Sequence, residues 1–220
     1  MSSQTRPRWL VWLLATLAAF SPLSIDTYLP SLPDIARELG TQDAQVQLTI
    51  GVFLAGLCSG MLLYGPLSDR YGRRRLLLGS LLLYILASVG CIWVASVEQL
   101  IVLRFLQAVG GAGALVLART VVRDLYPLSE AARMLSLMHV IAMVATLLAP
   151  IMGTYLVLLG GWRIIFVMLS LLGTGCLVAV AVALQESLPV EARTRSVLAS
   201  FRHYGTCLLY TLTLPTIYSV

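Results

Sequence analysis

Two charged residues and one amide lie inside otherwise apolar stretches of this chain, and their side chains can do chemistry there. Asp26 falls near the end of the first apolar run, Arg104 lies inside the fourth, and Gln107 follows three residues later. Ionisable groups are costly inside a bilayer, so each of them is a candidate functional residue. A carboxylate can carry a proton or bind a cation, whereas a guanidinium keeps its charge throughout. Asp26 therefore predicts a group that titrates or binds cations beside a polar cavity.

Both charged residues also have a purely structural interpretation. Asp26 could cap a helix end at the membrane interface, and Arg104 could extend to the outer lipid headgroups. Gln107, however, shares a helix face with Arg104, and the glycines that follow, Gly110 and Gly113 among them, let another helix approach closely. We therefore expect Arg104 and Gln107 in the protein interior. A fixed positive charge there would repel a proton on a nearby carboxylate, so the arginine could couple the protonation of that carboxylate to other events in the protein.

A short basic segment, residues 65–75, separates the second and third apolar runs. It combines turn residues and charges, namely Gly65, Pro66, Asp69, Arg70, Gly72 and Arg73, followed by two further arginines. We predict a cytoplasmic loop here, because translocating arginines across a membrane is costly. Asp69 could face the amino-terminal end of a neighbouring helix or pair with Arg73.

The fifth apolar run and its flanks hold weaker signals. Pro150 removes a backbone donor and Gly153 opens space, so the pair predicts a bend with close packing. We interpret His139 as a packing residue. We predict an ion cluster at the membrane interface, formed by Arg119, Arg123 and Asp124. We also predict a set of aromatic anchors at the interface: Trp9, Trp12, Tyr64 and Trp162.

The composition nearly forces a membrane protein. The 220 residues are 59% hydrophobic and 11% charged, with a mean hydropathy of +0.89, which leaves too little charge to cover a soluble domain. The net charge of +5 comes from arginines beside apolar runs, which fits membrane lipids and topology and argues against nucleic acid. No nucleotide-binding loop, zinc-binding histidine pair or serine–histidine arrangement is present, and the four cysteines lack metal-ligand spacing. We therefore expect neither an enzyme nor a metal or cofactor site.

Six apolar windows have the length of a membrane-spanning helix, so the predicted fold class is an all-α integral membrane protein. The windows are Trp9–Leu29, Ala44–Tyr64, Leu76–Ala95, Glu98–Val121, Met134–Leu158 and Arg163–Leu184. Twelve of the fifteen arginines fall in the alternate flanks that share a side with the amino terminus, and only Arg37 and Arg163 fall on the other. This bias predicts a cytoplasmic amino terminus.

Several of these segments together resemble a known family. They are residues 26–33, 65–75, 104–107, 119, 122–125, 149–153, 161–163 and 166. Their pattern is similar to the amino-terminal half of a major facilitator drug–proton antiporter of the bicyclomycin-resistance (Bcr/CflA) type, over about residues 9–190. One departure is Ala108, since exporters generally place glycine directly after the glutamine.

The resemblance implies a fold and a mechanism. The fold is the six-helix amino-terminal half of a twelve-helix transporter, which exports drugs or other lipophilic molecules by alternating access and uses the proton gradient instead of a cofactor. Asp26, Arg104 and Gln107 would couple protons to substrate in a bacterial cytoplasmic membrane. The cytoplasmic gate would comprise Gly65, Asp69, Arg70, Gly72 and Arg73. Pro150 and Gly153 would form the helix bend that favours export. The missing carboxy-terminal half would be the main protein partner.

The predicted domains are a six-helix membrane unit, residues 1–188, and a cytoplasmic central loop with an irregular tail, residues 189–220. The tail does not read like the family's seventh helix, so we expect an incomplete or artificially ended gene product. Two alternatives stay open. One is an amino acid or sugar transporter of the same superfamily, although the spans offer mainly Gln107 as an internal amide. The other is a six-helix scaffold that transports nothing.

Expressed alone in a bacterial host, the 220-residue chain should insert with both termini in the cytoplasm and confer no drug resistance. Insertion follows from the six apolar spans and the arginine bias, and inactivity follows from half a cavity. Reporter fusions at each terminus and a drug-susceptibility test measure both outcomes. Reporter activity in the periplasm would contradict the topology, and resistance from this chain alone would contradict the half-transporter interpretation.

Overall fold

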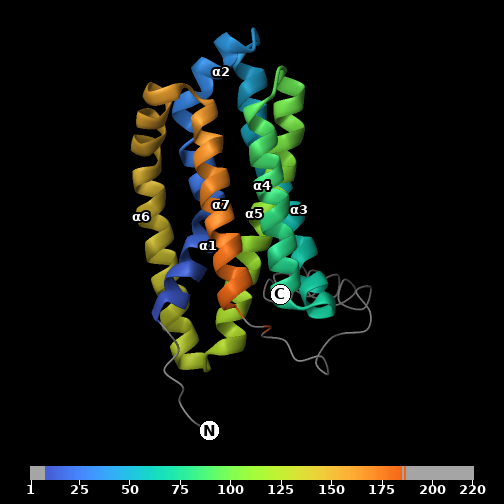
Figure 1. Ribbon diagram of the computed structural model, residues 1–220, viewed down its shortest axis with the longest axis vertical. Helices are drawn as coiled ribbons and strands as arrows, with labels where there is room; N and C mark the ends of the chain where they lie inside the picture. Colours follow the sequence, from blue (N-terminus) through green and yellow to red (C-terminus); the bar gives the residue numbers. More distant parts are fainter. Residues whose placement is uncertain (1–7, 185, 187–220) are drawn as a thin grey trace, which may run out of the picture.

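The computed structural model describes residues 8–184 and 186 and is entirely helical in this part of the chain (Figure 1). The elements are α1 (Arg8–Asp26), the 3₁₀ turn η1 (Leu29–Ser31), α2 (Leu32–Glu38), α3 (Asp43–Tyr71), α4 (Arg73–Ile92), α5 (Val97–Leu125), α6 (Leu128–Gly160) and α7 (Arg163–Ala183). Six segments are long and apolar enough to span a membrane, the first comprising α1 to α2. The predicted fold class is thereby confirmed. The predicted tail, residues 189–220, lies outside the described residues.

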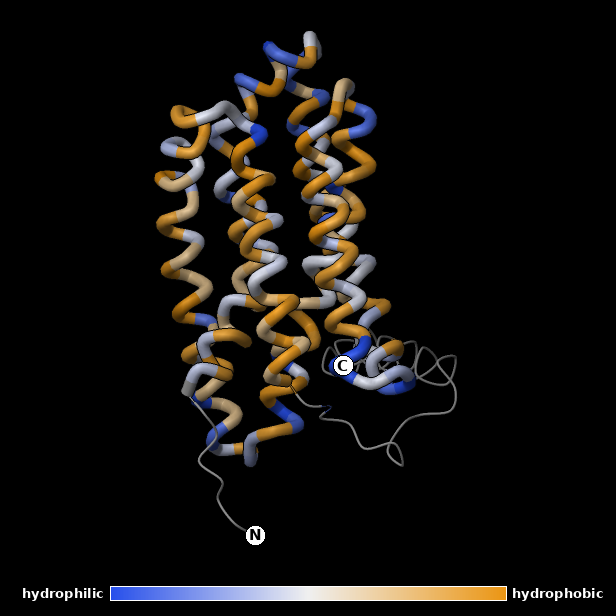
Figure 2. The backbone as a smooth tube through the Cα atoms, in the orientation of Figure 1, coloured by the Kyte–Doolittle hydropathy of each residue, from blue (hydrophilic) through white to orange (hydrophobic). Residues whose placement is uncertain are grey.

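Hydropathy follows the long axis of the bundle. Figure 2 shows hydrophobic residues along most of each long helix, with hydrophilic residues concentrated at α2 and at the junction of α3 and α4, at opposite ends. This distribution is the one that a bilayer selects, because its core offers no water to polar groups. The chain is a multi-pass membrane protein.

The first span is interrupted where the prediction had a single helix to Leu29. α1 ends at Asp26, and after η1 the chain resumes as the short α2. Pro30 and Pro33 explain the change, because neither has a backbone N–H to donate to the residue four positions earlier, so α1 cannot continue through them as a regular α-helix. The interruption leaves Asp26 at a helix end.

The predicted loop at residues 65–75 is wrong in its extent. α3 continues through Gly65, Pro66 and Asp69 to Tyr71, and α4 begins at Arg73, so Gly72 alone connects them. Pro66 removes only one backbone hydrogen bond, and in an apolar environment the other backbone groups are best satisfied by continuing the helix. Gly72 ends it with a φ of 91°, a conformation that side chains disfavour.

α5 is the central helix and packs against α3, α4 and α1. Its glycines make this possible. A Cβ atom on Gly110 would lie 2.6 Å from the Tyr84 backbone nitrogen and 2.7 Å from the Ser80 carbonyl oxygen of α4. The two backbones thus touch directly, which places the polar residues of α5 inside the bundle.

Gly110→Ala should therefore destabilise the chain, because the new methyl group meets backbone atoms that cannot move aside. Overpacking of this kind costs about 1–3 kcal/mol, which corresponds to a drop of about 5 °C in Tm. Thermal unfolding in detergent, followed with a thiol-reactive dye that reports the buried Cys91 and Cys176, measures the shift. Gly79→Ala is the matched control, because a Cβ at Gly79 meets nothing within 4 Å. Equal shifts in both variants would contradict the backbone contact.

Candidate functional site: a buried arginine and two ionic clusters

Arg104 lies fully buried at the centre of the bundle, with 0% of its surface exposed. Gln107, one turn later on α5, is also completely buried. The alternative in which Arg104 extends to the outer headgroups is therefore wrong, and the expected interior position is the one observed. Burial of a guanidinium is costly, so its surroundings must compensate for the lost water.

Hydrogen bonds link Arg104 to α1 and α4. Its Nη1 donates to Gln107 Oε1 at 2.8 Å, and its Nη2 donates to the Ser24 carbonyl oxygen at 3.2 Å. Gln107 Nε2 in turn donates to Ser88 Oγ at 2.8 Å. The Ser24 hydroxyl lies 2.6 Å from the Tyr84 hydroxyl, which closes the network between α1 and α4. Arg104 therefore joins three helices through one side chain.

Aromatic rings provide much of the remaining environment of the charge. The Arg104 guanidinium carbon lies 4.3 Å from the ring centroids of both Tyr28 and Phe53, and 5.9 Å from that of Phe166. Such cation–π contacts stabilise a desolvated cation by about 2 kcal/mol each. We call these three rings the aromatic cage. The sequence did not reveal the cage, because aromatic residues in uniformly apolar helices carry no sign of which face they occupy.

No carboxylate of the described residues pairs with Arg104, and its Nε has no hydrogen-bond partner there. Buried arginines are ordinarily paired, so this cation is unusual in having neutral partners and one unused donor. The arrangement can accept an anion without first breaking an ion pair.

Asp26 is partly exposed at the end of α1 and forms no ion pair within the described part of the chain. The structure does not bring it into contact with Arg104 or Gln107. It lies two residues after Ser24, whose carbonyl oxygen Arg104 holds. Asp26 is therefore linked to the arginine through the backbone of α1.

Gly153 of α6 packs against the same end of α1. A Cβ at Gly153 would collide with the backbone of Thr27, so α6 and the end of α1 are in backbone contact. α6 runs without interruption through Pro150. The two predicted bend residues thus lie on the helix that packs against the Asp26 segment.

Arg73 organises a second cluster at the junction of α3 and α4. Its guanidinium lies 2.7 Å from Asp69 Oδ1 and 3.1 Å from Asp124 Oδ2 of α5, and it also donates to Ser68 Oγ. Glu186 Oε1 accepts from the Arg73 backbone nitrogen at 2.8 Å. This cluster, Asp69, Arg73, Asp124 and Glu186, ties α3, α4, α5 and the residues after α7 together.

Two sequence interpretations need correction, one at this cluster and one on α6. Asp124 pairs with Arg73 instead of forming an ion cluster with Arg119 and Arg123, because the chain reversal at Gly72 brings Arg73 beside the end of α5. The guanidinium carbon of Arg70, which the sequence also predicts in the gate, lies 5.3 Å from the centroid of the Tyr71 ring. His139 is exposed on α6 and is not a packing residue.

A third cluster lies at the opposite end. Trp162 is 1% exposed and donates to Glu38 Oε2 at 2.6 Å, and Arg163 pairs with the same carboxylate. Arg163 also donates to the Ile92 carbonyl oxygen at 3.0 Å. Trp162 and Tyr64 are both buried, so their interpretation as interfacial anchors is wrong. The cluster fastens α2 to α4 and α7.

Comparison with known proteins identifies relatives. Residues 14–217 match the Major Facilitator Superfamily. The uncharacterized MFS-type transporter YdgK of Bacillus subtilis is 40% identical over 189 residues, covering 85% of this chain and 47% of the relative. A chloramphenicol resistance protein of Pseudomonas aeruginosa is 39% identical, covering 80% and 43%. A bicyclomycin resistance protein homologue of Haemophilus influenzae is 34% identical, covering 73% and 40%.

The chain spans about half the length of the curated relatives it matches. Among solved structures, the human organic anion transporter MFSD10 is similar in fold, with a TM-score of 0.69 at 19% identity, covering 88% of this chain and 51% of that one. The six helices thus have the arrangement expected for one half of such a fold. The chain is a member of the major facilitator superfamily.

Proposed function

We propose that the chain is the amino-terminal half of a proton-coupled exporter of drugs or other lipophilic small molecules, of the bicyclomycin-resistance type. The observation that carries the proposal is the buried Arg104–Gln107 network, which joins α5 to α1, in a chain whose relatives include chloramphenicol and bicyclomycin resistance proteins. The membrane is the bacterial cytoplasmic membrane, with the amino terminus in the cytoplasm. The second half of the cavity comes from a carboxy-terminal six-helix unit.

Coupling follows from the geometry around α1. Arg104 keeps its charge, holds the Ser24 carbonyl oxygen, and has no carboxylate partner among the described residues. Asp26 is partly exposed two residues further along α1 and is the acidic group that takes up and releases protons. A proton on Asp26 cancels its attraction to the positive site, and release of that proton restores it. The position of the end of α1 therefore depends on the proton.

Alternating access requires contacts that form in one state and break in another. The Asp69–Arg73–Asp124 contacts tie α3, α4 and α5 at the end assigned to the cytoplasm. They act as the cytoplasmic gate of this half, with Gly72 as the connection. Gly153 supports export because it lets α6 follow the end of α1 closely.

In the complete transporter, Arg104→Lys should reduce drug resistance at least about tenfold, although the charge remains. A lysine ammonium cannot donate to Gln107 and Ser24 from one planar group while it stacks on the aromatic cage. Resistance of an efflux-deficient host at equal membrane expression measures the effect. Arg37→Lys, on an exposed side chain of α2, is the control and should have no effect. Normal resistance with the Arg104 variant would reduce the residue to a point charge.

Asp26→Asn should slow proton-driven efflux about tenfold or more for cationic drugs, and less for neutral ones. The carboxylate serves as proton carrier for both and as ionic partner only for cations. Dye efflux from everted vesicles between about pH 6 and about pH 8, with a protonophore as the zero-gradient control, measures this. Asp34→Asn, already paired with Arg37 on α2, is the matched variant. Wild-type rates for both drug classes over this range would make Asp26 an interfacial cap, and efflux that ignores the protonophore would overturn proton coupling.

A further inference from the structure

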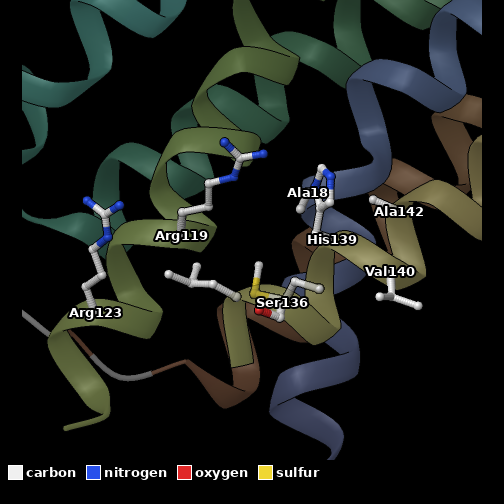
Figure 3. Close-up of a pocket in the computed structure, with 9 residues that line it drawn as sticks. Ala18, Arg119, Arg123, Ser136, His139, Val140 and Ala142 are labelled. Atoms are coloured by element: carbon white, nitrogen blue, oxygen red, sulfur yellow. The ribbon is translucent and has the colours of Figure 1, made fainter. Parts of the chain in front are cut away.

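A cavity of about 560 Å³ lies between α1, α5 and α6, and no residue of the Arg104 network lines it (Figure 3). It is lined by Arg119 and Arg123 of α5, by His139 and its neighbours on α6, and by Ala18 of α1. None of these residues takes part in the coupling or gate contacts described above. Its volume is in the range of sites that hold small organic molecules, roughly 300–1,000 Å³.

The polar side of this cavity is positively charged. Arg119 and Arg123 are four residues apart, so they share one face of α5, and Figure 3 shows the side chains of Arg119 and His139 reaching towards the same space from two helices. No acidic residue between 8 and 184 lines the cavity, and neither does Glu186. Neither arginine forms an ion pair with any residue between 8 and 184 or with Glu186.

The acidic residue nearest to these arginines in sequence, Asp124, forms an ion pair with Arg73. Asp124 follows Arg123 directly, yet its carboxylate lies 3.1 Å from Arg73 Nε in the gate cluster. The two arginines therefore carry a local charge that the cavity itself does not neutralise. A concave site with charge of one sign concentrates ions of the opposite sign.

Apart from Ser136 and His139, the other walls are apolar. Leu135, Met138 and Val140 of α6 supply hydrophobic surface, and the small side chains of Ala18 and Ala142 leave the space open. A fully hydrated inorganic anion would gain nothing from these walls. The combination fits a molecule with an apolar body and one anionic group.

We propose that this cavity binds the anionic group of an amphipathic organic molecule, a carboxylate or a phosphate ester, through Arg119 and Arg123, with its apolar body against α6. The inference rests on the proposed function in one respect, namely that the ligand reaches the cavity as cargo for export. The same chemistry is offered by an organic acid dissolved in the cytoplasm and by an anionic phospholipid of the inner leaflet.

Direct binding tests the site without requiring transport. The 220-residue chain is placed in phosphatidylcholine nanodiscs and titrated with 2-naphthoate and with the uncharged 2-naphthamide, which has the same shape. The acid should bind at least about tenfold more tightly than the amide, since a charge-assisted contact to an arginine contributes about 1.5 kcal/mol. Arg119→Gln with Arg123→Gln should abolish this preference. Arg133→Gln, an exposed arginine of α6 outside the cavity, should keep it.

A second arm identifies the source of the anion. Native mass spectrometry of the chain from discs that contain phosphatidylglycerol should show retained lipid that the double variant loses, if a phospholipid is the occupant. Displacement of that lipid by naphthoate would show that the phospholipid and the organic acid bind at the same site. The inference is overturned if the acid and the amide bind equally well in phosphatidylcholine discs and no lipid is retained. It is also overturned if Arg133→Gln loses the preference for the acid as completely as the double variant does. Binding without efflux in the complete transporter would count against the proposed export function alone.

Discussion

The bundle is organised around a fully buried charge that has no ionic partner within the described residues. Arg104 cannot lose its proton to escape burial, so its surroundings must solvate it. They do so with neutral groups: the Gln107 amide, the Ser24 carbonyl oxygen and the rings of the aromatic cage. These groups come from α1, α3, α5 and α7, and all must approach within a few ångströms of one atom group. The glycines of α5 follow from this requirement, because without close backbone packing the polar contacts could not meet.

Much of the fold could be predicted from hydropathy and arginine placement. Six apolar windows of spanning length give six helices, and the small residues after Gln107 indicate which face of α5 is buried. Helix ends were less predictable. Residues 65–71 look like a loop because Gly, Pro, Ser and Asp favour turns in water, but in an apolar environment a helix that contains Pro66 is still the best way to satisfy the backbone. The interruption after Asp26 was encoded by Pro30 and Pro33 and could have been found.

The site was predictable only in its charged members and in the amide Gln107. Arg104 and Gln107 stand out because polar groups are rare in spans, and their interior position followed from their spacing; Asp69 and Arg73 stand out in the basic segment between two spans. Their partners did not stand out. Asp124 and Glu186 reach Arg73 from far along the chain, and the Tyr28, Phe53 and Phe166 rings are indistinguishable by type from lipid-facing aromatics. Sequence spacing specifies contacts within a helix, whereas these contacts depend on how separate helices are placed.

The connection through Gly72 has a mechanical consequence. One residue spans at most about 3.6 Å, so the end of α3 and the start of α4 cannot separate, and neither helix can slide along its axis independently at that end. Relative motion of the two helices is limited to rotation about the two backbone dihedrals of Gly72. A tilt of α3 must therefore carry the first turn of α4 with it, together with Arg73 and the contacts that Arg73 makes to α5. A displacement of the end of α3 is therefore passed on directly to the start of α4.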